Sequence, residues 1–222
     1  MRSVRIILPL ILLLLLAFPW ACAQDAPPRI EVFAESGASF LNNGTAQFGL
    51  IACPDVCGPL GCIPCPVPGT VTGTFSKTGR LIAGARLRFT RHDAIEASYS
   101  YSPNHLSFQE GSQSMGSGYT RLDVISFNYV RYLSIGTRLQ PFATAGIGIN
   151  RFSGGPGLTA LPVGSDSGWR FGWSFGGGTD LVLQRHIALR VELRDYVTGQ
   201  PTIFTGTSHN IVPSAGIVFR FK

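Results

Sequence analysis

The densest group of reactive side chains in the chain is a run of four cysteines, Cys53, Cys57, Cys62 and Cys65. Four cysteines can hold zinc in a tetrahedral site, or they can form two disulfides in any of three connectivities. The intervening stretches of three, four and two residues do not make two CxxC knuckles, and proline and glycine between the cysteines suit a compact loop. Export from the cytoplasm, argued below, favours oxidation. We therefore expect two disulfides and no metal.

A second group with chemical potential is His105, Ser107 and Glu110, which follow one another in a polar stretch. A histidine can activate a neighbouring serine as a nucleophile, so these residues are the candidate centre of a hydrolase. Only three residues support that interpretation. We expect an ordinary solvated loop here and no catalytic residues.

The third group is a set of acidic and basic residues that alternate with apolar ones. Its members are Glu31, Glu35, Arg86, Arg88, Glu96, Arg170, Asp180, Arg190, Glu192, Arg194 and Arg220. Residues at every second position share one face of a β-strand. Acids and bases on facing strands can pair, so we expect a structural charge network rather than an acid–base catalyst.

The elements that position these residues follow an export signal at residues 1–23. Arg2 and Arg5 give a positive start, an apolar run extends over 6–18, and Ala21 and Ala23 provide small residues for cleavage. A spanning helix usually needs ~20 apolar residues. Because this run is shorter and contains proline, a retained anchor helix is the weaker alternative. The mature chain is expected to be 24–222.

The mature chain shows eight segments of period-two alternation, as expected for barrel strands. They are Arg29–Leu41, Arg80–Arg91, Ala94–Ser102, Tyr119–Tyr132, Leu139–Arg151, Trp169–Leu183, His186–Tyr196 and Asn210–Lys222. The fourth is the least regular, because Arg121, Asp123 and Arg131 stand at odd-numbered positions, on the same face of the strand as apolar residues. A bulge there would explain the irregularity.

The connections between these segments alternate in length. Long links are expected near 42–78, 103–118, 152–168 and 197–209, and short ones near 92–93, 133–138 and 184–185. Outer-membrane barrels have short periplasmic turns and longer outer loops. The pattern predicts a single domain with both mature chain ends at the short-turn end.

The charges indicate which face of the barrel is enclosed. A soluble lipocalin-like barrel encloses its apolar face, whereas a membrane barrel turns that face to lipid. Here the polar face carries both charge signs, and the apolar face carries more aromatic rings than a small soluble barrel could enclose. A transmembrane barrel is therefore favoured over a soluble periplasmic binding barrel. An eight-stranded barrel is filled by side chains, so a diffusion pore is not expected.

Several segments resemble the outer-membrane β-barrel family of OmpA, OmpX and opacity type: 141–148 (PFATAGIG), 175–180 (FGGGTD), 188–196 (ALRVELRDY) and 216–221 (GIVFRF). The resemblance implies an all-β, eight-stranded, antiparallel up-and-down transmembrane barrel in the outer membrane, without a cofactor. Members of this family usually end on an aromatic residue that the barrel assembly machinery recognises. This chain departs from that pattern, because Lys222 follows Phe221.

The expected function is that of a non-enzymatic outer-membrane protein, with a role in envelope integrity or surface contact. The resemblance leaves one enzymatic alternative, a lipid A deacylase using His105, Ser107 and Glu110, because some small outer-membrane barrels have that activity. Expected partners are outer-membrane lipids and lipopolysaccharide, the assembly machinery and an extracellular ligand. Of the 18 basic residues, 16 remain after cleavage against 12 acidic ones, a net charge of about +4. The basic residues are scattered, so nucleic acid is not an expected partner.

Overall fold

The computed structural model describes residues 29–42, 44–48, 56–58, 61–63, 69–110, 113–133, 138–154, 168–199 and 207–221. The predicted signal peptide at residues 1–23 lies outside these ranges, and so do Cys53 and Cys65. No helix within the described ranges is long and apolar enough to cross a membrane.

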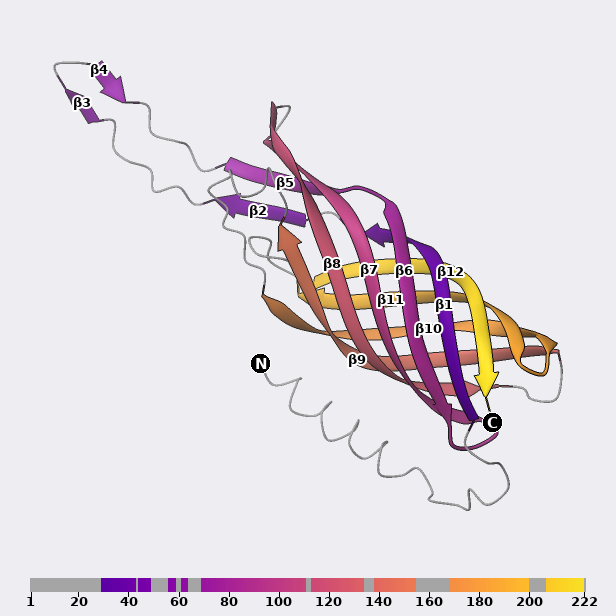
Figure 1. The fold of residues 1–222 in the computed structure, drawn as a ribbon. Coiled ribbons are helices and arrows are strands. Elements are labelled where there is room, and N and C mark those ends of the chain that lie inside the picture. Colours follow the sequence, from indigo (N-terminus) through magenta and orange to yellow (C-terminus); the bar gives the residue numbers. More distant parts are fainter. Residues whose placement is uncertain are drawn as a thin grey trace, which may run out of the picture.

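Eight antiparallel strands form a closed barrel (Figure 1). They are β1 (Arg29–Leu41), β6 (Thr78–Arg88), β7 (Asp93–Glu110), β8 (Gln113–Tyr132), β9 (Leu139–Gly154), β10 (Trp169–Gln184), β11 (Ile187–Gly199) and β12 (Thr207–Phe221). Each barrel strand pairs with the next one along the chain, and β1 pairs with β12 to close the ring. Closure removes the unpaired edges that hydrocarbon would not tolerate. The predicted eight-stranded up-and-down barrel is therefore confirmed.

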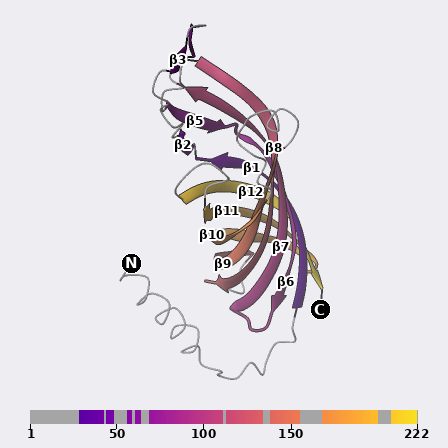
Figure 2. The same cartoon turned by 90° about the vertical axis from the view of Figure 1, so that its left-hand side faces the viewer.

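Four short strands lie between β1 and β6 in the sequence: β2 (Gly44–Phe48), β3 (Val56–Gly58), β4 (Gly61–Ile63) and β5 (Gly69–Phe75). β2 pairs with β5, and β5 pairs with the far half of β7, from Val71 opposite Glu110 to Phe75 opposite Leu106. A small sheet thus extends one end of the barrel, as Figure 2 shows.

The loop predicted at 103–118 is wrong for most of its length. β7 continues to Glu110 and β8 begins at Gln113. Regular apolar alternation is lost in this stretch because the outer face of the hairpin no longer needs to be apolar. β5 supplies hydrogen-bond partners on the other side of β7, so the backbone stays in the sheet without an alternating pattern.

The two faces of the barrel wall differ sharply. Charged and polar side chains from all eight strands are buried inside, including most of the predicted charge network. Large apolar side chains stay exposed on the outside, among them Ile30, Val32, Leu81, Ile95, Phe127, Ile147, Phe171, Trp173, Phe175, Leu189, Val191, Ile217 and Phe219. A polar interior and an apolar wall form the pattern of a barrel surrounded by lipid, and they are the reverse of a soluble binding barrel.

The irregular fourth segment is explained by two polar clusters on the outer wall. Arg131 donates to Asp93 at 2.5 Å near one end of the wall, and Arg121 donates to Asp123 at 2.7 Å near the other. Arg121 and Arg131 are ten residues apart, which is about 33 Å along a strand and about 25 Å across a bilayer at a usual strand tilt. That height matches the apolar band of an outer-membrane barrel.

The bulge suggested within that segment is not found there. The register of β8 against β7 is unbroken between Gly116 and Arg131, and its shift falls at Phe108 and Gln109 of β7, beyond the apolar wall. The charged residues therefore border the membrane band while the strand stays regular.

Candidate functional site in the barrel lumen

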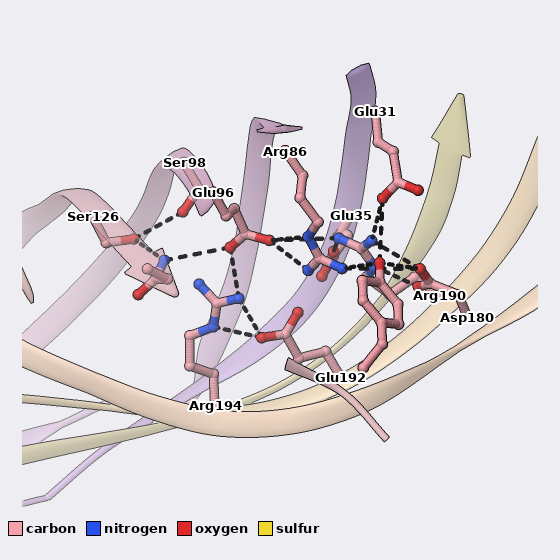
Figure 3. A network of polar contacts seen from close by, with 12 residues as sticks. Glu31, Glu35, Arg86, Glu96, Ser98, Ser126, Asp180, Arg190, Glu192 and Arg194 are labelled. Carbon is pink, nitrogen blue, oxygen red and sulfur yellow. Dashed lines mark hydrogen bonds and ion pairs between the residues drawn. The ribbon is translucent and has the colours of Figure 1, made fainter. Parts of the chain in front are cut away.

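Strand register sets acids opposite bases inside the barrel. Glu31 of β1 faces Arg86 of β6 on one side and Arg220 of β12 on the other. Glu96 of β7 faces Arg86, and Asp180 of β10 faces Arg190 of β11 in the same way. The local alternation puts each charge inside, and the register then gives each one an oppositely charged neighbour (Figure 3).

Arg190 and Asp180 form the best-connected pair of the network. Arg190 Nε and Nη2 donate to the two oxygens of Asp180 at 2.7 and 3.1 Å. The same guanidinium lies 3.6 Å from Glu35 and 3.7 Å from both Glu31 and Glu96. Asp180 and Arg190 are both fully buried. Charge pairs removed from water in this way interact strongly, but each member is costly to leave alone.

Other contacts cross the lumen between strands that are not neighbours. Arg194 of β11 donates to Glu96 of β7 at 2.8 Å. Tyr132 of β8 accepts from Arg86 at 2.5 Å and donates to Asp180 of β10 at 3.1 Å. Such bridges place side chains across the interior at the level of the network.

An inward-facing glycine makes room for one aromatic ring of this layer. A Cβ on Gly178 would lie 2.4 Å from the carbonyl oxygen of Val191 and 2.9 Å from the ring of Phe142. That ring in turn packs under the guanidiniums of Arg86 and Arg190, at 4.6 and 5.2 Å from its centroid. Position 178 therefore requires a glycine, because the neighbouring strand approaches closely and the Phe142 ring of the cation–π stack occupies the space of a Cβ.

A second layer of the interior is apolar and lies toward the long-loop end. Leu41, Phe75, Leu106, Leu122 and Phe152 are buried together there. Sequence reasoning assigned only polar groups to this face and missed these residues. Their parity alone would have placed Leu106, Leu122 and Phe152 inside, because each shares its face with inward polar residues of the same strand.

The structure brings ten of the predicted network residues into contact through ion pairs, and Arg170 is separate from them. Arg170 lies on β10 ten residues before Asp180, about 33 Å along the strand. Sequence reasoning missed Tyr132, Gln140 and Arg80, which also face the lumen. Gln140 accepts from both Arg88 and Arg220 at 3.2 Å. The signal for Arg80 was available, because it has the same parity as Arg86 and Arg88.

The hydrolase candidates all lie on β7 rather than in a loop. His105 and Ser107 share one face of β7, whereas Glu110 has the opposite parity in that strand. The His105 ring meets Tyr119 edge-on, with centroids 5.1 Å apart. His105 therefore packs against an aromatic ring, with no described contact to Ser107.

The structure places two of the four clustered cysteines. Cys57 of β3 and Cys62 of β4 occupy directly facing positions of a hairpin. Facing positions of two antiparallel strands have the Cα separation that a disulfide needs. Within the described part of the chain, no group of three or more His, Cys, Asp or Glu residues is arranged to hold a metal ion. The two disulfides stay a prediction.

A closed barrel with a charged interior and an apolar outer wall defines an integral outer-membrane protein. The family model described as "Outer membrane protein beta-barrel domain" matches residues 10–220, so the chain belongs to that family and is located in the outer membrane. No curated protein sequence matches the chain.

The solved structures that share this fold include two outer-membrane proteins. Outer membrane protein OprG from Pseudomonas aeruginosa has a TM-score of 0.60 over 87% of this chain and 95% of its own, at 12% identity. Neisserial surface protein A (NspA) has a TM-score of 0.54 over 88% of this chain and 100% of its own, also at 12% identity. At this identity the likeness concerns the fold alone.

Proposed function

We propose that this protein is a non-enzymatic, non-conducting barrel that stabilises the outer membrane and presents its extended sheet to the cell exterior. The observation that carries the proposal is the set of side-chain bridges across the lumen. Arg194 to Glu96 joins opposite walls of the barrel, and Tyr132 to Asp180 joins two strands on either side of β9. The buried apolar cluster places further side chains inside the barrel toward the long-loop end. A scaffold needs such a filled interior, whereas a pore would need an open one.

Planar-bilayer recording tests the filled lumen. The mature chain, refolded in detergent and added to a lipid bilayer, should give no stable stepwise conductance under conditions in which a general porin does. Insertion is checked separately by protection of the barrel from protease. A reproducible open channel from the inserted wild-type protein would refute the proposal.

Surface display is tested on intact cells. The chain between β2 and β5, residues 49–68, should be cut by protease added outside the cells, while the barrel strands stay protected. Protection of that segment on intact cells, with cleavage only after the outer membrane is opened, would place it on the periplasmic side and contradict the orientation proposed here.

The enzymatic alternative predicts a clear activity. A lipid A deacylase would release fatty acid from lipopolysaccharide, and His105→Ala or Ser107→Ala would abolish that release. We expect no release by the wild-type protein, because the His105 ring packs against Tyr119 and has no described contact with Ser107. Release that disappears in either variant would establish the enzyme.

We propose lipopolysaccharide as the lateral partner of the outer leaflet. Arg121 and Arg151 lie toward the long-loop end of the wall, and the Arg151 guanidinium lies 5.7 Å from the ring centroid of Trp169. Basic groups next to aromatic residues at this height suit the phosphates of lipid A. The assembly machinery and an extracellular ligand remain proposed partners as well.

Stability in defined vesicles tests the lipid partner. Lipopolysaccharide should raise the unfolding midpoint of the wild-type protein more than phosphatidylglycerol does, and Arg151→Gln should reduce that difference. Arg131→Gln, at the opposite rim, is the matched control and should keep it. Equal midpoints in both lipids would contradict the proposal.

A further inference from the structure

Among the described residues around the charge network, the charges on the inner face do not balance. Each of the five carboxylates, Glu31, Glu35, Glu96, Asp180 and Glu192, has at least one arginine within 3.9 Å. Five arginines supply these contacts, namely Arg86, Arg88, Arg190, Arg194 and Arg220. Arg80 is a sixth arginine on the same inner face, and it forms no ion pair with any residue that the structure describes. This part of the lumen therefore carries one positive charge in excess.

Arg80 is deeply buried and only partly satisfied. Its exposed fraction is 1%. Its Nη2 donates to Ser100 Oγ at 2.6 Å, and its guanidinium stacks 4.3 Å from the ring centroid of Tyr196. Its Nε and Nη1 atoms have no partner among the described residues. A buried cation without a counter-charge is among the costliest groups in a protein interior.

Three further unpartnered polar groups lie at or next to Tyr196, the ring on which Arg80 stacks, and each of them can donate a hydrogen bond. They are Nη1 of Arg194, the hydroxyl of Tyr196 and Nδ2 of Asn210. Tyr196 connects them: Arg194 lies 5.9 Å from its ring centroid, and Asn210 is its facing residue on β12. Asn210 is held in place because its Oδ1 accepts from Ser39 Oγ at 2.8 Å. Groups on β6, β11 and β12 that can donate hydrogen bonds thus lie around Tyr196, and the named atoms have no partner among the described residues.

This arrangement selects an anion. Water can accept hydrogen bonds from the donors, but it leaves the excess positive charge in place. A cation would add to that charge. Because the excess is one unit, a monovalent anion neutralises it, while a phosphate dianion would replace it with a negative one. A large organic acid would also have to be buried next to the apolar cluster toward the long-loop end.

We propose that Arg80, together with the free donors of Arg194, Tyr196 and Asn210, binds a monovalent anion of the halide class inside the barrel. The ion completes the charge balance of the lumen and stabilises the folded protein. The ion links the charged network to Arg80, Tyr196 and Asn210, where side-chain pairing alone leaves hydrogen-bond donors unsatisfied.

Anomalous diffraction with bromide locates the ion directly. Crystals of the wild-type protein grown or soaked in sodium bromide should show an anomalous peak within hydrogen-bond distance of the Arg80 guanidinium. Crystals of Arg80→Met, whose side chain has a similar length and no charge, should lack it. A wild-type site occupied by water alone, or bromide bound only at the protein surface, would overturn the proposal. The wild-type measurement does not depend on whether the variant folds.

Unfolding in solution provides the second test. At constant ionic strength, replacing gluconate by chloride should raise the folded-to-unfolded ratio in proportion to one plus the chloride concentration over its Kd, about 100-fold at 100 times Kd. Arg80→Met should lose this dependence, and Arg131→Met, a half-exposed rim arginine, should keep it. An equal chloride effect in wild type and Arg80→Met, or no effect in wild type, would refute the anion site.

Discussion

Replacing Arg190 by methionine isolates the contribution of the lumen network to stability. Methionine keeps much of the side-chain volume and removes only the charge and the donors. Asp180 then loses hydrogen bonds of 2.7 and 3.1 Å but keeps Arg220 at 3.2 Å. Glu35 loses the one arginine that lies within ion-pair distance among the described residues, and it keeps one hydrogen bond, from Ser214 at 2.6 Å. One buried carboxylate is therefore left without a counter-charge.

The expected loss follows from that imbalance. Breaking a buried ion pair by removing one partner destabilises a protein by about 3–5 kcal/mol. Because Asp180 retains other arginines, we expect Arg190→Met to lie near 3 kcal/mol. That loss is about a 150-fold fall in the folded-to-unfolded ratio. Adding Glu35→Gln should recover part of it, because the amide keeps a hydrogen bond to Ser214 without a buried charge.

Urea unfolding of the refolded mature chain provides the assay. Trp169 and Trp173 lie exposed on the lipid-facing wall. Their fluorescence therefore changes when the barrel unfolds and these side chains leave the lipid or detergent around it. Arg131→Met is the control, since a half-exposed pair with Asp93 is worth less than about 1 kcal/mol. The reasoning fails if Arg190→Met is as stable as the control, or if Glu35→Gln further destabilises the Arg190→Met variant.

Three further predictions use the same preparation. Gly178→Ala should lower the unfolding free energy by about 1–3 kcal/mol, because its Cβ would overlap backbone and the Phe142 ring. Gly199→Ala has open space around its Cβ and should change the unfolding free energy little. Equal losses in the two variants would contradict the packing argument. Thiol labelling of the denatured, unreduced mature chain should find no free cysteine, and peptide mapping should link Cys57 to Cys62, so labelling of both would refute that link. The folded barrel should migrate faster on detergent gels before heating than after it, and unchanged migration would count against a closed barrel.

The alternating pattern was enough to predict the faces of the strands. Glu31, Arg86 and Asp180 stand at every-second-residue positions among apolar neighbours, and all three are buried in the lumen. This prediction succeeds because the side-chain period of a strand is a local property. Arg80 stands on the same face of its strand as Arg86, so its inward position was predictable from the sequence. Its lack of an acidic partner was not.

The tertiary structure decided which residues meet across the barrel. Arg194 and Glu96 are far apart in sequence and lie on strands that do not pair, so only closure of the ring brings them to 2.8 Å. The extension of β7 and β8 through 103–118 also needed β5, since the partner that satisfies their backbone comes from another part of the chain. Alternation along one strand determines inside and outside, whereas register and curvature determine partners, because those depend on every strand in the ring at once.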